Sequence, residues 1–207
     1  MAADNLNAAA QQIFPETTAE DEARAGVYAV LGALLRDVPD AGLLAQVRAL
    51  PPAEARDQFA LAWEGLRLAA LQVSPGEVND EYHLLFIGLG RGELVPYGSW
   101  YQTGFLMETP LGVLRDDLRA LGYERRDGVH EPEDHVAALC EVMAAMAADP
   151  NIPVERQRDF YQSHLGPWVS RFWADLGAAE SAVFYRAVAG LGGAFDALEA
   201  RYLDMEV

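Results

Sequence analysis

The sequence predicts an all-α protein. Apolar residues recur at spacings of three and four, the period of a helix with one buried face, in about nine or ten successive segments. No segment shows the sustained alternation of apolar and polar residues that a half-buried strand produces. Proline and glycine interrupt the apolar patterns too often for a long coiled coil. We therefore expect a globular, bundle-like domain of short and medium helices.

Length and composition fit one folded domain. The chain has 207 residues, and 51% of them are hydrophobic, which is enough to build a packed core. Residues 1–16 are polar and rich in alanine, and we expect them to form a disordered tail. The helical domain is then expected over residues 17–207.

Local signals mark the helices of the first half. The spacing in Thr17-Thr18-Ala19-Glu20 is typical of a capping box, and Ser74-Pro75-Gly76-Glu77 combines such a box with proline in the first turn. Pro39-Asp40 and Pro51-Pro52 break the chain between apolar patterns. The predicted helices cover about 20–36, 43–50, 59–70 and 77–87.

The second half begins with a stretch rich in glycine and aromatic residues, 88–101. We expect an ordered loop here, because aromatic side chains seek packing. Its glycines are not followed by the Gly-Lys-Ser/Thr of a phosphate-binding loop. Further helices are predicted at about 109–121, 132–148, 154–165, 168–176 and 179–203. We interpret the polar connection at 123–131 as a hinge between sublobes at about 17–122 and 132–205.

The chain is strongly acidic. Asp and Glu number 32 against 15 basic residues, all of them arginine, and the formal net charge is -17. Such a surface disfavours nucleic acid and anionic membranes as partners, since both attract positive charge. It either steers a basic partner toward the protein or simply keeps the protein soluble.

Cys140 is the only cysteine, so an internal disulfide is excluded, and its apolar neighbours favour a buried thiol over a nucleophile. The N-terminus lacks the basic and apolar regions of a secretory signal. No uncharged apolar run approaches the ~18 residues of a spanning helix. We expect a cytoplasmic protein that enters no membrane.

A polar run, Glu131-Pro132-Glu133-Asp134-His135, precedes the most apolar helical pattern in the chain. Proline and acidic groups are favourable in the first turn of a helix, so the run predicts a helix start. At a spacing of four, Glu131 and His135 share a face, with Asp134 beside them. The same run therefore has the groups to hold a cation, to act as a base or to bind a ligand.

Four motifs occur in order along this helical pattern. They are Glu81-Tyr82-x-x-Leu85-Phe86-x-Gly88, Pro96-Tyr97-x-Ser99-x-Tyr101, Glu131-Pro132-x-Asp134-His135 and His164-Leu165-x-Pro167-Trp168-x-x-x-Phe172. Phe184-Tyr185-Arg186 adds a weaker fifth. Over roughly residues 20–205 the chain resembles the TorD/DmsD/NarJ family of dedicated cytoplasmic chaperones for molybdenum-cofactor oxidoreductases.

The resemblance implies a protein that catalyses no reaction and needs no cofactor. It implies binding of the twin-arginine signal peptide of a partner oxidoreductase, and of its cofactor-free catalytic subunit, so that export waits for cofactor insertion. Some relatives bind guanine nucleotide weakly, and relatives occur as monomers or as dimers that exchange helices. The implied leader site comprises Pro96, Tyr97, Ser99, Tyr101, Glu131, Pro132, Asp134 and His135. The implied structural motif comprises Glu81, Leu85, Phe86, Gly88, His164, Leu165, Pro167, Trp168 and Phe172.

Plainer interpretations of single residues stay open. Asp134 and His135 either contact a ligand arginine or only form the helix start. Tyr97 and Tyr101 either line a groove or fill the core beneath a loop. For Glu131 we favour a role in holding the connection at 123–131.

Two other classes of protein remain as alternatives. One is a helical adaptor without specificity for a leader. The other is a metal-dependent enzyme that uses Glu131, Asp134, His135 and His164 as ligands. Diiron bundles, however, repeat a Glu-x-x-His motif on two helices, whereas here Glu131 precedes His135 by four and no second copy exists.

Overall fold

The computed structural model describes residues 17–53, 57–88, 91–125, 128 and 131–205. Within these ranges the secondary structure is helical apart from one isolated bridge, which confirms the predicted all-α class. The predicted tail at 1–16 lies outside the described residues. The helices are α2 (Ala19–Arg36), α3 (Ala41–Arg48), α4 (Gln58–Gln72), α5 (Pro75–Tyr82), the π-helix η1 (His83–Ile87), α6 (Gly98–Thr103), α7 (Thr109–Ala120), α8 (Val136–Ala148), α9 (Val154–His164), α10 (Val169–Ala178) and α11 (Phe184–Met205).

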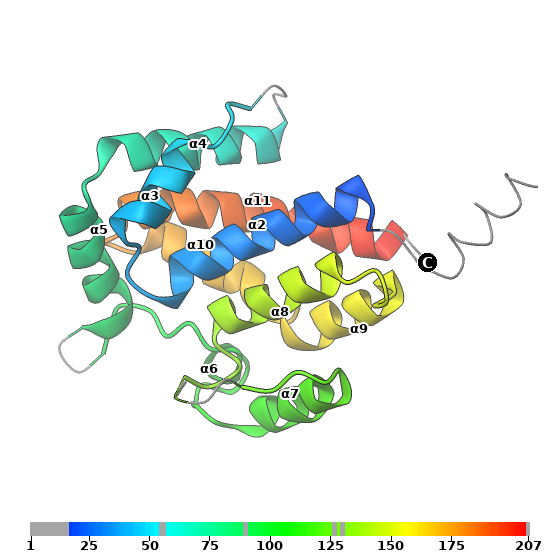
Figure 1. Ribbon diagram of the computed structural model, residues 1–207. Coiled ribbons are helices and arrows are strands. Elements are labelled where there is room, and N and C mark those ends of the chain that lie inside the picture. The colour runs from blue at the N-terminus through cyan, green and yellow to red at the C-terminus, as the bar shows by residue number, and fades with distance from the viewer. Residues whose placement is uncertain (1–16, 54–56, 89–90, 126–127, 129–130, 206–207) are drawn as a thin grey trace, which may run out of the picture.

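Helix α11 crosses the middle of the molecule. It packs against α4 and α10 and also touches α2, α5 and α9, while α2 packs along α8 (Figure 1). Aromatic side chains such as Trp168, Phe172, Phe184 and Tyr185 are fully buried in this core. Cys140 is also buried there, as its apolar neighbours predict, and burial raises the pKa of its thiol above the usual range. None of the helices in the described ranges combines the length and apolar character that crossing a membrane requires.

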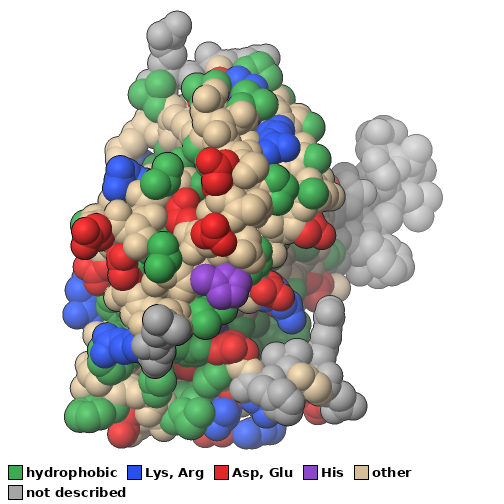
Figure 2. Space-filling view, turned by 90° about the vertical axis from the view of Figure 1, so that its left-hand side faces the viewer, with side chains coloured by type: hydrophobic (Ala, Val, Ile, Leu, Met, Phe, Trp, Pro, Cys, Tyr) green, Lys and Arg blue, Asp and Glu red, His purple; other side chains and the backbone are tan. Residues whose placement is uncertain are grey.

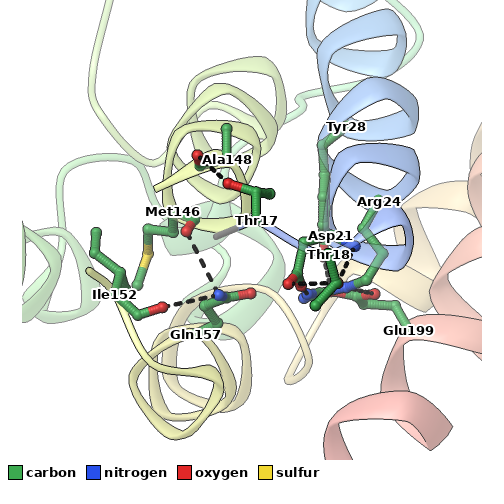
Figure 3. Close-up of polar contacts among 10 residues, drawn as sticks. All are labelled: Thr17, Thr18, Asp21, Arg24, Tyr28, Met146, Ala148, Ile152, Gln157 and Glu199. Atoms are coloured by element: carbon green, nitrogen blue, oxygen red, sulfur yellow. Dashed lines mark hydrogen bonds and ion pairs between the residues drawn. The ribbon is translucent and has the colours of Figure 1, made fainter. Parts of the chain in front are cut away.

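A buried ion pair joins α2 to α11. The Arg24 guanidinium donates to both carboxylate oxygens of Glu199, at 2.9 and 2.6 Å, and Tyr28 donates to the same carboxylate at 3.3 Å (Figure 3). The Arg24 and Glu199 side chains are only 5% and 0% exposed. Forked pairing of this kind satisfies several donors at once, which an ion pair needs when water is excluded. The pair therefore fixes how α2 lies on α11.

The helix starts agree with the capping signals, with one shift. Ser74 and Glu77 form the predicted capping box at the start of α5. At α2 the capping side chain is Thr18, which accepts from the Asp21 amide at 3.0 Å, so the cap lies one residue beyond the predicted Thr17–Glu20 spacing. The α2 helix consequently starts at Ala19.

Glu81 caps the last helix from a distant part of the chain. Its carboxylate accepts from the backbone amides of Val183, Phe184 and Tyr185 at 2.8, 3.0 and 2.7 Å, and the residue is 7% exposed. The amides of a first helical turn have no partner within their own helix, so a buried carboxylate there is strongly favourable. Because Glu81 supplies this cap, α11 starts at Phe184 and not at the predicted residue 179.

The helix predicted at 77–87 changes type before it ends. After Tyr82 the backbone widens into the π-helix η1, where the Gly88 amide donates to the His83 carbonyl at 2.7 Å. Gly88 has a φ of +60°, and a Cβ at this position would lie 2.0 Å from the Arg91 carbonyl oxygen. A residue with a side chain does not fit there, which explains the glycine that ends this motif.

Other predicted boundaries are also corrected. The expected loop at 88–101 contains the start of the short helix α6. The helix expected from Pro132 starts at Val136, because Pro132 to Asp134 form a turn in which the His135 amide donates to the Pro132 carbonyl. The division into sublobes at 17–122 and 132–205 stays a prediction.

Candidate functional site

Two of the sequence motifs meet where α6 and α8 begin. The backbone of 96–98 runs antiparallel to that of 134–136, with a bridge between Tyr97 and His135. The Val136 amide donates to the Pro96 carbonyl, and the Gly98 amide donates to the Asp134 carbonyl, both at 2.9 Å. The fold thus brings together two segments that the sequence separates by more than 30 residues.

Asp134 lies inside this junction. It is 3% exposed, and its Oδ2 accepts from the backbone amide of Ser99 at 2.7 Å. Ser99 is itself fully buried. The Asp134 carboxylate therefore holds the first turn of α6 against the start of α8.

His135 caps α8 with its imidazole. Its Nδ1 accepts from the Ala137 amide at 3.1 Å, so a neutral ring carries its proton on Nε2. Burial, together with the charge of Arg36, lowers the pKa of His135 to about 4. The ring of Tyr97 meets the imidazole edge to face, with centroids 5.1 Å apart. His135 is thus a neutral, buried cap near neutral pH.

Glu131 projects beside this cap. Its carboxylate accepts the hydroxyl of Tyr97, which ties the turn before α8 to the segment before α6. Burial raises the pKa of Glu131, and the neighbouring charge of Asp134 raises it further. The contact fits the role in holding the connection that the sequence indicated, while the residue also faces a groove.

Residues of α8, of the end of α2, of the end of α7 and of the segment after α7 line this groove. Figure 1 shows where these helices lie. It encloses about 360 Å³. Small apolar side chains of α8 form its floor, namely Ala137, Ala138, Val142 and Ala145. We call it the α8 groove.

The α8 groove is acidic. Four glutamates and two arginines line it, so two negative charges remain unbalanced within the described lining: Glu124, Glu131, Glu133, Glu141, Arg36 and Arg125. The face of the molecule shown in Figure 2 carries acidic, basic and hydrophobic side chains together. The groove can therefore attract a cationic ligand and offer it an apolar floor.

Two of these glutamates already pair with arginines of the chain. Arg115 contacts Glu133 at 2.8 Å, and Arg125 lies 3.9 Å from the same carboxylate. Burial alone would raise the pKa of Glu133, but the hydrogen bonds that its carboxylate accepts and the charges of Arg115 and Arg125 together outweigh burial, and the pKa is lowered. Glu141 pairs with Arg36 at the end of α2.

The structure divides the predicted leader-site residues. Glu131, Pro132 and His135 line the α8 groove, and Tyr97 contacts two of them. The remaining predicted residues do not line it. Pro96, Ser99 and Asp134 are buried in the α6–α8 junction.

Tyr101 points elsewhere. Its ring stacks on Trp168 with centroids 5.3 Å apart, and its hydroxyl donates to Asp175 at 2.9 Å. Burial raises the pKa of this hydroxyl above the usual range, and the bond to Asp175 adds to the effect. The plainer interpretation, an aromatic packed beneath a loop, describes Tyr101 better than a place in the groove.

Sequence reasoning missed Arg36, Glu124 and Glu141 as groove residues. Glu141 lies about 9 Å along α8 from His135, from six residues at 1.5 Å each. One face of α8 carries residues 137, 138, 141, 142 and 145. Glu141 is the single charged residue on that otherwise apolar face, and this was the signal in the sequence that could have identified it as a groove residue. Arg36 carried no such signal, because its pairing depends on how α2 packs.

The residues of the predicted structural motif help to pack the helices against one another. Leu85, Leu165 and Phe172 are buried, and Phe86 packs against Tyr82 and Tyr185. His164 contacts Asp117 through Nε2 at 2.8 Å, and the indole of Trp168 donates to the His164 carbonyl at 2.6 Å. Pro167 is exposed at the turn between α9 and α10.

The residues considered as metal ligands are engaged in these separate contacts. In the part of the chain that the structure describes, His, Cys, Asp and Glu side chains form no group of three or more that could hold a metal ion.

The residues that the structure describes form an all-helical fold with a groove along α8. Residues 53–174 match the family described as nitrate reductase delta subunit. The chain belongs to this family, the TorD/NarJ group of maturation chaperones that the four motifs indicated, which is a family of non-enzymatic proteins.

Relatives of known name agree with this assignment. The chain is 28% identical over 148 residues to the chaperone protein TorD of Vibrio cholerae serotype O1, covering 67% of each chain. It is 25% identical over 138 residues to TorD of Vibrio parahaemolyticus, covering 61% of this chain and 64% of the relative. A solved structure from Archaeoglobus fulgidus, described as a redox enzyme maturation protein, superposes with a TM-score of 0.52 at 19% identity. That likeness covers 87% of this chain and 93% of the other and supports the fold.

Proposed function

We propose that this protein is a cytoplasmic maturation chaperone whose α8 groove binds the twin-arginine leader of a molybdenum-cofactor oxidoreductase. The bound leader is withheld from export until the enzyme has received its cofactor. The chaperone also contacts the cofactor-free body of that enzyme. Family membership supports the chaperone role, and the named TorD relatives support a redox-enzyme client.

The observation that carries the leader proposal is the charge of the groove. Its lining offers more carboxylates than guanidinium groups, even when Arg115, which pairs with Glu133 from outside the lining, is counted, and a twin-arginine leader brings two guanidinium groups. Arginine pairs with carboxylates in a planar, two-pronged geometry that is stronger than a neutral hydrogen bond. The negative sign of the groove's net charge favours this ligand over an anionic or neutral one.

The shape of the groove supports the same ligand. In an extended peptide, successive side chains point to opposite sides, so neighbouring arginines need acceptors on both walls. Glu141 belongs to the α2 side of the groove, while Glu131 and Glu133 belong to the connection side. The alanines between them let a peptide backbone come close to α8.

Calorimetric titration with two leader peptides tests the proposal. The first carries the arginine pair and the apolar segment after it, and the second has both arginines changed to alanine. We expect the first to bind more tightly, with an affinity that weakens as salt is raised, because part of the attraction is between partly exposed charges. Equal affinities would reject a charge-reading groove and favour an adaptor without leader specificity.

A further inference from the structure

Two arginine–carboxylate pairs tie α2 to neighbouring helices, and they differ in exposure. Arg24 and Glu199 are buried in the core (Figure 3), whereas the side chains of Arg36 and Glu141 are 46% and 41% exposed at the rim of the α8 groove. A buried pair cannot lose one member without leaving an unpaired charge in the interior. An exposed pair is weakly held, because water solvates either member when they part. The pair of Arg36 and Glu141 is therefore the one whose members can exchange partners.

Glu141 is the fixed member of this pair. It lies within α8, and its Cγ packs over Gly32 of α2, where a Cβ would come within 3.2 Å of that atom. The same Cβ would lie 3.3 Å from the Ala137 carbonyl oxygen, so Gly32 allows α2 and α8 to approach closely beneath the glutamate. The carboxylate is thus placed at the groove by the packing of two helices.

Arg36 is the mobile member. It is the last residue of α2, and the next residue, Asp37, is already extended, so one rotatable side chain carries the guanidinium to the groove. Arg36 lines the same groove as His135 at the start of α8, and its charge contributes to lowering the pKa of His135. An arginine side chain anchored at a helix end can swing away while the helix stays in place.

We infer that Glu141 binds one of the leader's two arginines and that Arg36 occupies this carboxylate until the leader arrives. The inference rests on the proposed function and assigns its contacts. The incoming guanidinium replaces an equivalent one, so the carboxylate is never left bare, and the exchange selects for arginine over uncharged side chains. Arg36 then acts as an internal competitor that weakens leader binding.

The test compares leader affinity in Arg36→Gln, Glu141→Gln and the double variant, by fluorescence anisotropy with a labelled leader. Loss of the competitor in Arg36→Gln is expected to tighten binding about two- to five-fold, the range that an exposed ion pair accounts for. Glu141→Gln is expected to weaken binding by a similar or larger factor. In the Glu141→Gln background, removing Arg36 should tighten binding by a clearly smaller factor, because the contested carboxylate is gone and only the repulsion between Arg36 and the leader is relieved.

Arg67→Gln is the matched control. Arg67 pairs with Glu64 on α4, a helix on the opposite side of the molecule from α7 and the groove connection (Figure 1), and its loss changes the net charge by the same amount. We expect its affinity to stay within about 1.5-fold of the original, since screening limits the reach of an exposed charge. Thermal melting of each variant verifies that it is folded at the assay temperature.

The outcomes separate the two proposals. If the unaltered protein binds the leader but Arg36→Gln binds it equally or more weakly, the internal competitor is wrong and the leader site stands. A gain that is undiminished in the Glu141→Gln background, or that Arg67→Gln reproduces, also rejects the inference. If the unaltered protein does not distinguish the arginine leader from its alanine version, both proposals fail.

Discussion

Glu81→Ala tests the claim that one carboxylate, supplied from a distant motif, holds the central helix in place. The substitution leaves the amides of Val183, Phe184 and Tyr185 without their acceptor at a buried helix start. A buried polar group that loses its partner costs about 1–3 kcal/mol, and the three losses are not additive because they share one acceptor. We therefore expect the free energy of unfolding to fall by roughly 3–5 kcal/mol.

The corresponding change in melting temperature is large. A domain of this size loses about 2–4 °C per kcal/mol, so Glu81→Ala should melt roughly 6–20 °C lower, measured by calorimetry at pH 7. Glu81→Gln keeps an acceptor oxygen but loses the charge, so its melting temperature should lie between those of the original protein and Glu81→Ala. Glu93→Ala is the control, because Glu93 also accepts from the segment before α11, at Ser181, but does so at the surface. A Glu81→Ala protein that melts within about 2 °C of Glu93→Ala would refute the reasoning.

Two further predictions concern the α6–α8 junction. Asp134→Ala should lower the free energy of unfolding by about 2 kcal/mol, because the buried amide of Ser99 loses its acceptor, while Asp134→Asn retains an acceptor and should lose less. Urea unfolding measures this, and an unchanged stability with weakened leader binding would instead make Asp134 a ligand contact. The pKa of His135 is lowered to about 4 in the folded protein, whereas its ordinary value is near 6.5. Between these two pH values the unfolded chain takes up a proton that the folded protein does not. The free energy of unfolding therefore falls as the pH drops from about 6.5 to 4. His135→Asn keeps a capping side chain that takes up no proton in this pH range. The free energy of unfolding of the original protein should therefore fall by up to about 3 kcal/mol more than that of the variant between about pH 6.5 and 4. Parallel pH profiles of the two proteins would contradict the lowered pKa of His135.

Much of the fold follows from local signals. The capping box at Ser74 and the helical period of the apolar residues locate helices whose starts depend on neighbouring residues only. The start of α11 could not be found this way, because its capping carboxylate, Glu81, stands 103 residues before the Phe184 amide that it accepts from. The change from α5 to η1 is a rearrangement of backbone hydrogen bonds for which the side-chain pattern has no signature.

At the candidate site, too, some features are visible in the local sequence and others depend on how the helices pack. The polar run before α8 drew attention to Glu131 and His135, which line the groove, because proline and acidic groups at a helix start are visible in the sequence. The pairing of Arg36 with Glu141 depends on α2 lying along α8, which no spacing within either helix reveals. Asp134 is buried and the half-buried Tyr101 stacks on Trp168, because tertiary packing, and not residue type, decides which polar groups of a motif face the groove.

Chemical-shift mapping by NMR locates the leader on the surface of the protein. We predict that the arginine leader shifts the backbone amides of Ala138, Glu141 and Ala145 on the groove face of α8, and that the alanine leader shifts them much less. Shifts confined to another surface, such as the exposed leucines 61, 68 and 71 of α4, would contradict this prediction.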